Sequence, residues 1–170
     1  MIIPAGTAAA PRTAWPLSCS MPPMAALVTA PGTARAYLAS VLASWNLAAL
    51  AVDGQAVVSE LVSNAVAAST VAGQPMYLGG RVAVVRLALL SDGSRLVTEV
   101  YDQAPGAPAI REPQSDSETG RGLLIVRQLT RGRWGWSLLH GQPGKVVWAE
   151  LAAEPALGPA ARAAGQLCRP

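Results

Sequence analysis

Two apolar runs joined by an Asp-Gly turn constrain the fold of this chain more than any other feature. The runs Val82–Leu90 and Arg95–Asp102 are rich in Val and Leu, and the four residues between them read Ser-Asp-Gly-Ser. Asp-Gly between two such runs is typical of a β-hairpin, because both residues tolerate the backbone conformations of a tight turn. The sequence therefore predicts a pair of antiparallel strands here.

Two helices are predicted before this hairpin. The first begins near Pro31, where proline is tolerated in a first helical turn, and runs to about Trp45. The second begins after Asp53, which we expect to cap it, and reaches about Ser69. Its apolar side chains share one broad arc and predict burial against a large surface; they are Val57, Val58, Leu61, Val62, Ala65 and Val66.

The remaining segments complete an alternation of strands and helices. They are a short strand over Met24–Thr29, a long loop over Gln103–Thr119, a helix over Leu123–Leu129, and a closing hairpin of Trp134–Leu139 with Lys145–Leu151. This order favours an α+β fold, a two-layer sandwich in which about three helices cover one face of a mostly antiparallel sheet.

A chain of 170 residues fits one domain. We expect that domain at residues 24–151. Residues 1–23 are a mixture of Pro, Ala, Thr and Ser without a period and predict a disordered leader, and residues 152–170 predict a flexible tail.

Composition and charge narrow the class of protein. Hydrophobic residues make up 51% of the chain and charged residues 14%, which favours a compact globule over a disordered tail protein. The net charge of +3 comes from basic residues scattered along the chain, so we expect no direct contact with nucleic acid. Cys19 and Cys168 lack the spacing of a metal site or redox pair.

One uncharged stretch, Ala36–Val52, calls for a membrane test. It is shorter than the roughly 20 apolar residues of a membrane span and carries polar residues, so we interpret it as an amphipathic core helix. Prolines interrupt the N-terminal segment, which is therefore unlike a secretory signal. A cytoplasmic protein without membrane contact is the expectation.

Glu60 and Asn64 lie four residues apart in the second predicted helix, so they share one face at the edge of its apolar arc. The carboxylate could act as a base toward a hydroxyl or water, and the carboxamide oxygen could bind Mg²⁺. A solvated polar pair explains the same pattern and is the simpler interpretation of this pair alone.

Two further positions suggest ligand binding. Asp102 ends a predicted strand, where its carboxylate could accept a hydrogen bond from an exocyclic amine or simply begin a turn. Gly120-Arg121-Gly122-Leu123 opens a predicted helix, and glycines there let free backbone N–H groups approach an anion. An ordinary tight loop remains the alternative for this segment.

Taken in order, these three positions resemble a known family. Glu60–Ala65 resembles the N box of the Bergerat ATP-binding fold, Asp102–Gly106 its first glycine box and Gly120–Val126 its second. The resemblance covers about residues 24–151. The stretches VVSELVSNAV, TGRGLLIVRQL, RWGW and GKVVWAEL look like those of small anti-sigma-factor serine kinases and related stand-alone actinobacterial ATP-binding proteins.

This resemblance implies a regulator that binds ATP and Mg²⁺, phosphorylates a serine or threonine of a small antagonist protein, and holds a sigma factor in its other state. A homodimer is compatible with it. Glu60 would be the catalytic base, Asn64 the Mg²⁺ ligand and Asp102 the partner of the adenine amine. The other nucleotide-binding residues would be Gly106, Thr119, Gly120, Arg121, Gly122 and Leu123, and Gln103–Thr119 would form a lid.

The sequence departs from the family pattern at three places. Ala104 replaces the first glycine of the first glycine box, the closing GKVV lacks the Gly-Thr pair that often completes the pocket, and Ala68 stands near the position of a histidine in many relatives. These departures bear on nucleotide affinity and turnover. The alternative function is a non-catalytic interaction module of the same fold, which acts through partner binding with or without ATP.

Overall fold

A six-stranded antiparallel sheet is the frame of the protein. The computed structural model describes residues 15–108 and 122–153. The strand order is β1-β7-β8-β10-β9, and β2 also pairs with β7. The strands are β1 (Leu17–Ser20), β2 (Met24–Ala25), β7 (Val84–Ser91), β8 (Arg95–Asp102), β9 (Trp134–Leu138) and β10 (Lys145–Ala152).

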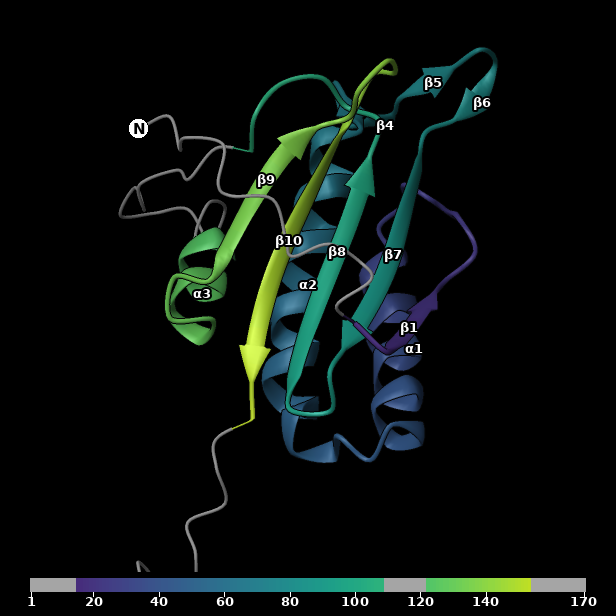
Figure 1. Cartoon of the computed structure of the whole chain (residues 1–170). Helices are drawn as coiled ribbons and strands as arrows, with labels where there is room; N and C mark the ends of the chain where they lie inside the picture. Colours follow the sequence, from purple (N-terminus) through teal and green to yellow (C-terminus); the bar gives the residue numbers. More distant parts are fainter. Residues whose placement is uncertain (1–14, 109–121, 154–170) are drawn as a thin grey trace, which may run out of the picture.

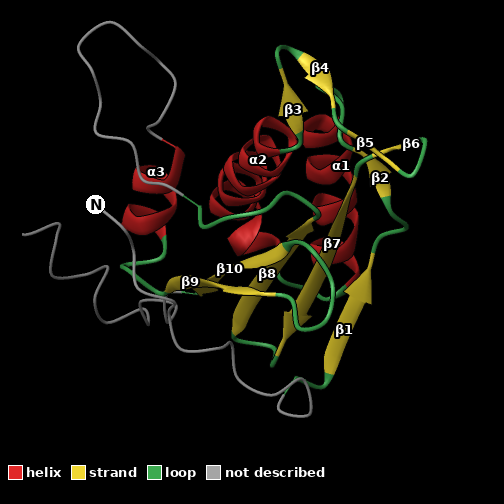
Figure 2. Cartoon of the chain, turned by 90° about the horizontal axis from the view of Figure 1, so that it is seen from above, coloured by secondary structure: helices red, strands yellow, loops and turns green. Residues whose placement is uncertain are grey.

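The helices lie over one face of this sheet (Figures 1 and 2). They are α1 (Ala30–Ser44), the short 3₁₀ turn η2 (Ala48–Leu50), α2 (Ala51–Ala68) and α3 (Gly122–Leu129). The predicted α+β sandwich is confirmed, and so is the hairpin of β7 and β8 around Asp92-Gly93.

The core lies between the sheet and the helices. Alternate residues of β8 face α2, among them Leu96 and Val100, which are almost completely buried. Near the start of α2, a Cβ added to Gly54 would meet Leu38 at 3.2 Å and Leu96 at 3.4 Å. Both helices and β8 therefore meet at Gly54, where a larger side chain would not fit.

The opposite face of the sheet carries a smaller apolar cluster. Trp15, Leu90 and Val97 are buried there, with Trp148 packed against them. The guanidinium group of Arg95 lies 4.9 Å from the centroid of the Trp15 ring, within range of a cation–π interaction.

The expectation that residues 1–23 form a disordered leader is wrong for residues 15–23. β1 pairs with β7 from Leu17 opposite Ser91 to Ser20 opposite Ala88, and Met21 N–H donates to the Leu87 carbonyl at 2.9 Å. Without this strand, β7 would expose an unpaired edge along the half that runs from Ala88 to Ser91. Residues 1–14 lie outside the described residues.

Other boundaries also differ from expectation. Asp53 does not cap α2, which begins two residues earlier at Ala51 without a side-chain cap; the Asp53 carboxylate lies in the first turn, where the helix dipole favours it. The strand expected over Met24–Thr29 is only the two residues of β2. The domain extends past residue 151, because Ala152 ends β10 and Ala153 N–H donates to the Ser94 carbonyl.

Two small hairpins between α2 and β7 were not predicted. They pair β3 (Thr70–Val71) with β4 (Gln74–Pro75), and β5 (Tyr77–Leu78) with β6 (Arg81–Val82). Glycines with positive φ at 73, 79 and 80 make the reversals, which explains why this segment shows no regular period.

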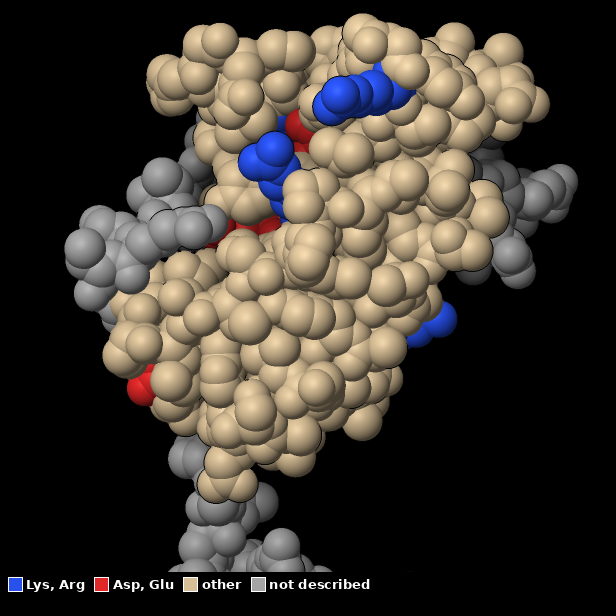
Figure 3. Space-filling view, turned by 90° about the vertical axis from the view of Figure 1, so that its right-hand side faces the viewer, with Lys and Arg blue, Asp and Glu red and all other residues tan. Residues whose placement is uncertain are grey.

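The surface carries few charged side chains. On the face shown in Figure 3, Lys, Arg, Asp and Glu are scattered over a largely uncharged surface and form no continuous basic stripe. In the part of the chain that the structure describes, no helix is long and apolar enough to cross a membrane.

Candidate functional site

The second half of α2 lies over the end of the sheet that carries Asp102. α2 starts above Leu96 near the beginning of β8, and the two elements run in the same direction (Figure 1). From Gly54 to Asn64 the helix rises about 15 Å, and from Leu96 to Asp102 the strand advances about 20 Å. Glu60 and Asn64 are therefore near the same end as Asp102.

The first turn of α3 lies directly against Glu60 and Asn64. A Cβ added to Gly122 would overlap Glu60 Oε2 and would come within 3.5 Å of Asn64 Nδ2. Only glycine fits there without displacing the carboxylate. The structure thus brings together two motifs that are nearly 60 residues apart in the sequence.

The polar groups at this junction differ in exposure. The Glu60 side chain is half-buried and Asn64 is exposed, so both remain accessible to solvent. Leu123, the next residue of α3, is buried in the core and anchors the helix start. A half-buried carboxylate beside the N-terminus of a helix can accept a proton in a site that backbone N–H groups make favourable for anions.

Asp102 is buried and ion-paired, a feature that the sequence analysis did not predict. Its residue is 2% exposed. Asp102 Oδ1 accepts hydrogen bonds from Lys145 Nζ at 2.8 Å and from Ala104 N–H at 2.9 Å. Burial raises the pKa of Asp102 above its ordinary value, although Lys145 and the Ala104 N–H partly oppose that shift.

Lys145 is the site residue that sequence reasoning missed. Its Cα lies opposite that of Asp102 in the β8–β10 register, and its side chain points to the same face. Strand alternation could have predicted its burial. Side chains of a strand alternate between the two faces, so Lys145 faces the same way as the inward-facing Val147 and Ala149. A lysine at an inward position of a central strand calls for a buried partner.

Two glycines shape the backbone near Asp102. Gly106 is exposed with φ of +87°, a conformation that favours glycine in the first glycine box. Gly144 has φ of +119°, and a Cβ there would overlap the Asp102 carbonyl oxygen. The second glycine therefore lets β10 begin in close contact with the end of β8. Thr119, Gly120 and Arg121 lie outside the described residues.

A comparison with protein families decides the identity of the fold. The family model of the histidine kinase-like ATPase domain matches residues 24–149, which is most of the chain. The chain belongs to this family. A search of curated proteins found none that matches this chain.

Membership in the histidine kinase-like ATPase family makes this an ATP-binding regulatory domain. The match begins at residue 24, so β1 and Trp15 lie outside it although they belong to the folded domain. Among the described residues there is no cluster of three or more His, Cys, Asp and Glu side chains that could hold a metal ion.

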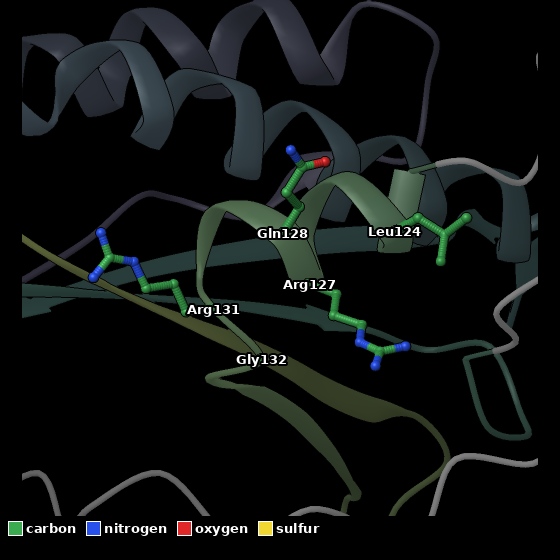
Figure 4. Close-up of a pocket in the computed structure, with 5 residues that line it drawn as sticks. All are labelled: Leu124, Arg127, Gln128, Arg131 and Gly132. Carbon is green, nitrogen blue, oxygen red and sulfur yellow. The ribbon is translucent and has the colours of Figure 1, made fainter.

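Two hollows of this histidine kinase-like ATPase domain lie away from the junction of α2 and α3. One, of about 410 Å³, follows the face of α3 opposite the buried Leu123 and Val126; it is lined by Leu124, Arg127, Gln128, Arg131 and Gly132. In Figure 4 the guanidinium groups of Arg127 and Arg131 point in different directions, so they do not converge on one ligand.

The second hollow, of about 210 Å³, lies at the end of the sheet near Asp102. It is lined by Val84, Arg86, Tyr101, Asp102, Gln103, Leu139, Gln142 and Pro143. Arg86 and Tyr101 are opposite each other in the β7–β8 register and belong to the face turned away from the helices. This hollow therefore opens mainly on the other side of the sheet from Glu60.

Proposed function

We propose that this protein is an ATP- and Mg²⁺-dependent serine/threonine kinase of the anti-sigma-factor type, which phosphorylates a small antagonist protein. One observation carries the proposal: Gly122 at the start of α3 lies against both Glu60 and Asn64. A candidate base, a candidate metal ligand and a helix N-terminus are thus adjacent, and phosphoryl transfer depends mainly on such positioning.

The residues gathered at Gly122 and Asp102 have chemistry suited to a bound nucleotide. Gly122 adds no side chain between the start of α3 and the Glu60 carboxylate. Backbone N–H groups at a helix start favour negative charge such as that of a phosphate. No described donor engages Asp102 Oδ2, which leaves it for an exocyclic amine. Asn64 offers a carboxamide oxygen for Mg²⁺, which usually binds to one or two protein groups together with substrate phosphates.

The role of the chain's own residues follows from these positions. Bound ATP with Mg²⁺ would supply the phosphoryl group. Glu60 accepts the proton of the incoming serine or threonine hydroxyl, and the N–H groups at the start of α3 hold negative charge in place. The proposed nucleotide contacts are completed by Gly106, Leu123 and the segment of Thr119, Gly120 and Arg121.

The proposed partners are a sigma factor, the antagonist and a second copy of the chain, and the proposed location is the cytoplasm.

The test combines binding with phosphotransfer. Calorimetry should show saturable, Mg²⁺-dependent ATP binding to the wild type, and Asp102→Asn should weaken it strongly. Glu60→Gln should retain ATP binding but lose phosphorylation of candidate antagonists. Glu150→Gln, which changes a carboxylate on the opposite face of the sheet, is the matched control and should behave as wild type. An active Glu60→Gln variant would contradict the assigned role of Glu60.

A non-catalytic interaction module of the same fold is the second candidate, and one residue favours it. Ala104 stands at the first glycine of the first glycine box and is 1% exposed, so its methyl group occupies space beside Asp102. If the folded wild type binds partners but shows neither ATP binding at millimolar concentration nor phosphotransfer, this second function replaces the first.

A further inference from the structure

The buried pair of Asp102 and Lys145 is costly as a purely structural device. The two side chains are only 1% and 4% exposed. Removing two charges from water carries a desolvation penalty that their mutual attraction often only matches, and apolar side chains of similar size frequently stabilise such a position as well or better. A role in ligand recognition is a reason to keep the pair.

The pair retains one unused acceptor and one unused donor. Both hydrogen bonds to the Asp102 carboxylate fall on Oδ1, from Lys145 Nζ and from Ala104 N–H. The Lys145 ammonium group has three N–H bonds. Within the described residues, one donates to Asp102 Oδ1 and a second donates to the Ala104 carbonyl at 3.3 Å. Asp102 Oδ2 and the third N–H of Lys145 are neighbours without a described partner.

The backbone holds these two groups in place. Lys145 is opposite Asp102 in the β8–β10 register, and Gly144 packs directly against the Asp102 carbonyl. Both side chains belong to the face of the sheet that α2 covers, because they alternate in register with the core residues Val100 and Val147. An acceptor and a cationic donor are therefore fixed side by side where β8 ends and β10 begins.

This arrangement matches the Watson–Crick edge of adenine, which offers the N6 amine as donor beside N1 as acceptor. We propose that Lys145 is a specificity-determining residue that donates a hydrogen bond to adenine N1 while Asp102 Oδ2 accepts one from the N6 amine. The inference rests on the proposed function, since it takes ATP as the ligand of this cleft.

Ligand analogues test the contact without changing the protein. In 1-deaza-ATP a C–H group replaces N1, and in purine riboside triphosphate a hydrogen replaces the N6 amine. Wild type should bind 1-deaza-ATP about 10- to 100-fold more weakly than ATP, the range for a hydrogen bond to a charged group. The wild type should also bind purine riboside triphosphate more weakly than ATP, because the hydrogen bond from the N6 amine to Asp102 Oδ2 is lost.

The variant Lys145→Met completes the comparison. It should bind ATP and 1-deaza-ATP with equal affinity, whereas the control Arg86→Met, which removes an exposed cation on the other face of the sheet, should discriminate as wild type does. Circular dichroism confirms that each variant is folded.

The outcomes separate this inference from the proposed function. Equal binding of ATP and 1-deaza-ATP by the wild type overturns the role of Lys145 and leaves ATP binding intact. Tighter ATP binding by Lys145→Met also overturns it, because Lys145 would then compete with the base for Asp102. A folded wild type that binds neither nucleotide overturns both.

Discussion

The two ends of the contact between α2 and β8 differ sharply, although the same helix and strand make both. At the first end, Gly54 packs against Leu38 and Leu96 in an entirely apolar setting. At the second end, Asp102 is equally well buried but carries a charge paired with Lys145. Burial alone therefore does not distinguish a core from a site in this molecule; the identity of the buried groups does.

This difference has an energetic meaning. The apolar end gains stability from each buried methylene group, on the order of 0.8 kcal/mol. The polar end gains little, because desolvation of the pair offsets its attraction. Substitutions at the first end should therefore change stability and leave the binding of folded protein unchanged. Those at the second end should change binding, and they also lower stability where one charge is left buried without its partner.

The largest effect is expected from Leu96→Ala. Leu96 is completely buried, so the substitution should lower the free energy of unfolding by about 2–5 kcal/mol through lost contacts and the cavity left behind. Urea denaturation measures this change, and calorimetry below the transition should find ATP affinity unchanged. The control Leu138→Ala truncates a side chain that is 54% exposed and should cost far less.

Gly122→Ala should weaken ligand binding or phosphotransfer while leaving stability almost unchanged. Its new methyl group would overlap Glu60 Oε2, so the carboxylate must move away from the start of α3. We expect ATP affinity or phosphotransfer to fall by about tenfold, on the scale of a displaced charged hydrogen-bonding group, with a change in stability below about 1 kcal/mol.

Gly32→Ala is the matched control for that substitution. Gly32 also lies near a helix start, but a Cβ there meets only the end of Arg35 at 3.8 Å. The variant should bind and fold like the wild type. Equal loss of binding in both variants would mean that the glycine at 122 has no special relation to Glu60.

Stability should depend on pH through Asp102 at the polar end. Because its folded pKa is raised above the ordinary value of 3.8, the folded state takes up a proton more readily than the unfolded state. Its contribution is therefore fully present below pH 3.8 and is lost as pH rises through the folded pKa. Urea titrations should show wild type losing stability relative to Asp102→Asn over this window. The opposite slope would mean that Lys145 outweighs burial.

The smallest effect is expected away from both ends, at Tyr37 of α1. Burial, and then a 2.7 Å hydrogen bond with the Cys19 thiol, raises the pKa of Tyr37 from 10.0 to about 12. The stability linked to this phenol is present below pH 10.0 and is lost between pH 10.0 and about 12. Absorbance at phenolate wavelengths should show that Tyr37→Phe removes a late titration step, whereas Cys19→Ala shifts it only modestly downward.

Local patterns predicted the frame of the fold well. The Asp-Gly turn located the β7–β8 hairpin, and the apolar arc from Val57 to Val66 located α2, because both signals depend on neighbours in sequence. β1 was missed for the same reason. Its residues lie in a proline-rich stretch without a period, and only the distant edge of β7 makes them a strand.

Local sequence patterns predicted part of the candidate site as well. Spacing placed Glu60 and Asn64 on one helix face, but only the fold shows that Gly122 touches both. The ion pair of Asp102 and Lys145 depends on the register between β8 and β10, which no local pattern specifies. Asn64 is exposed, so burial gives no sign of a metal role, and the proposed Mg²⁺ contact follows from the family resemblance.

The strand order also has a consequence for the order in which the protein is made. β10 is the last strand in sequence among the described residues, yet it lies between β8 and β9 in the sheet. A chain emerging from the ribosome can form the β7–β8 hairpin and add β1 to it, but β8 keeps an open edge until β10 arrives. Asp102 has no cationic partner until Lys145 has been synthesised. The proposed base-recognition site therefore stays incomplete until β10 has been made, and this one strand both fills the sheet between β8 and β9 and completes that site.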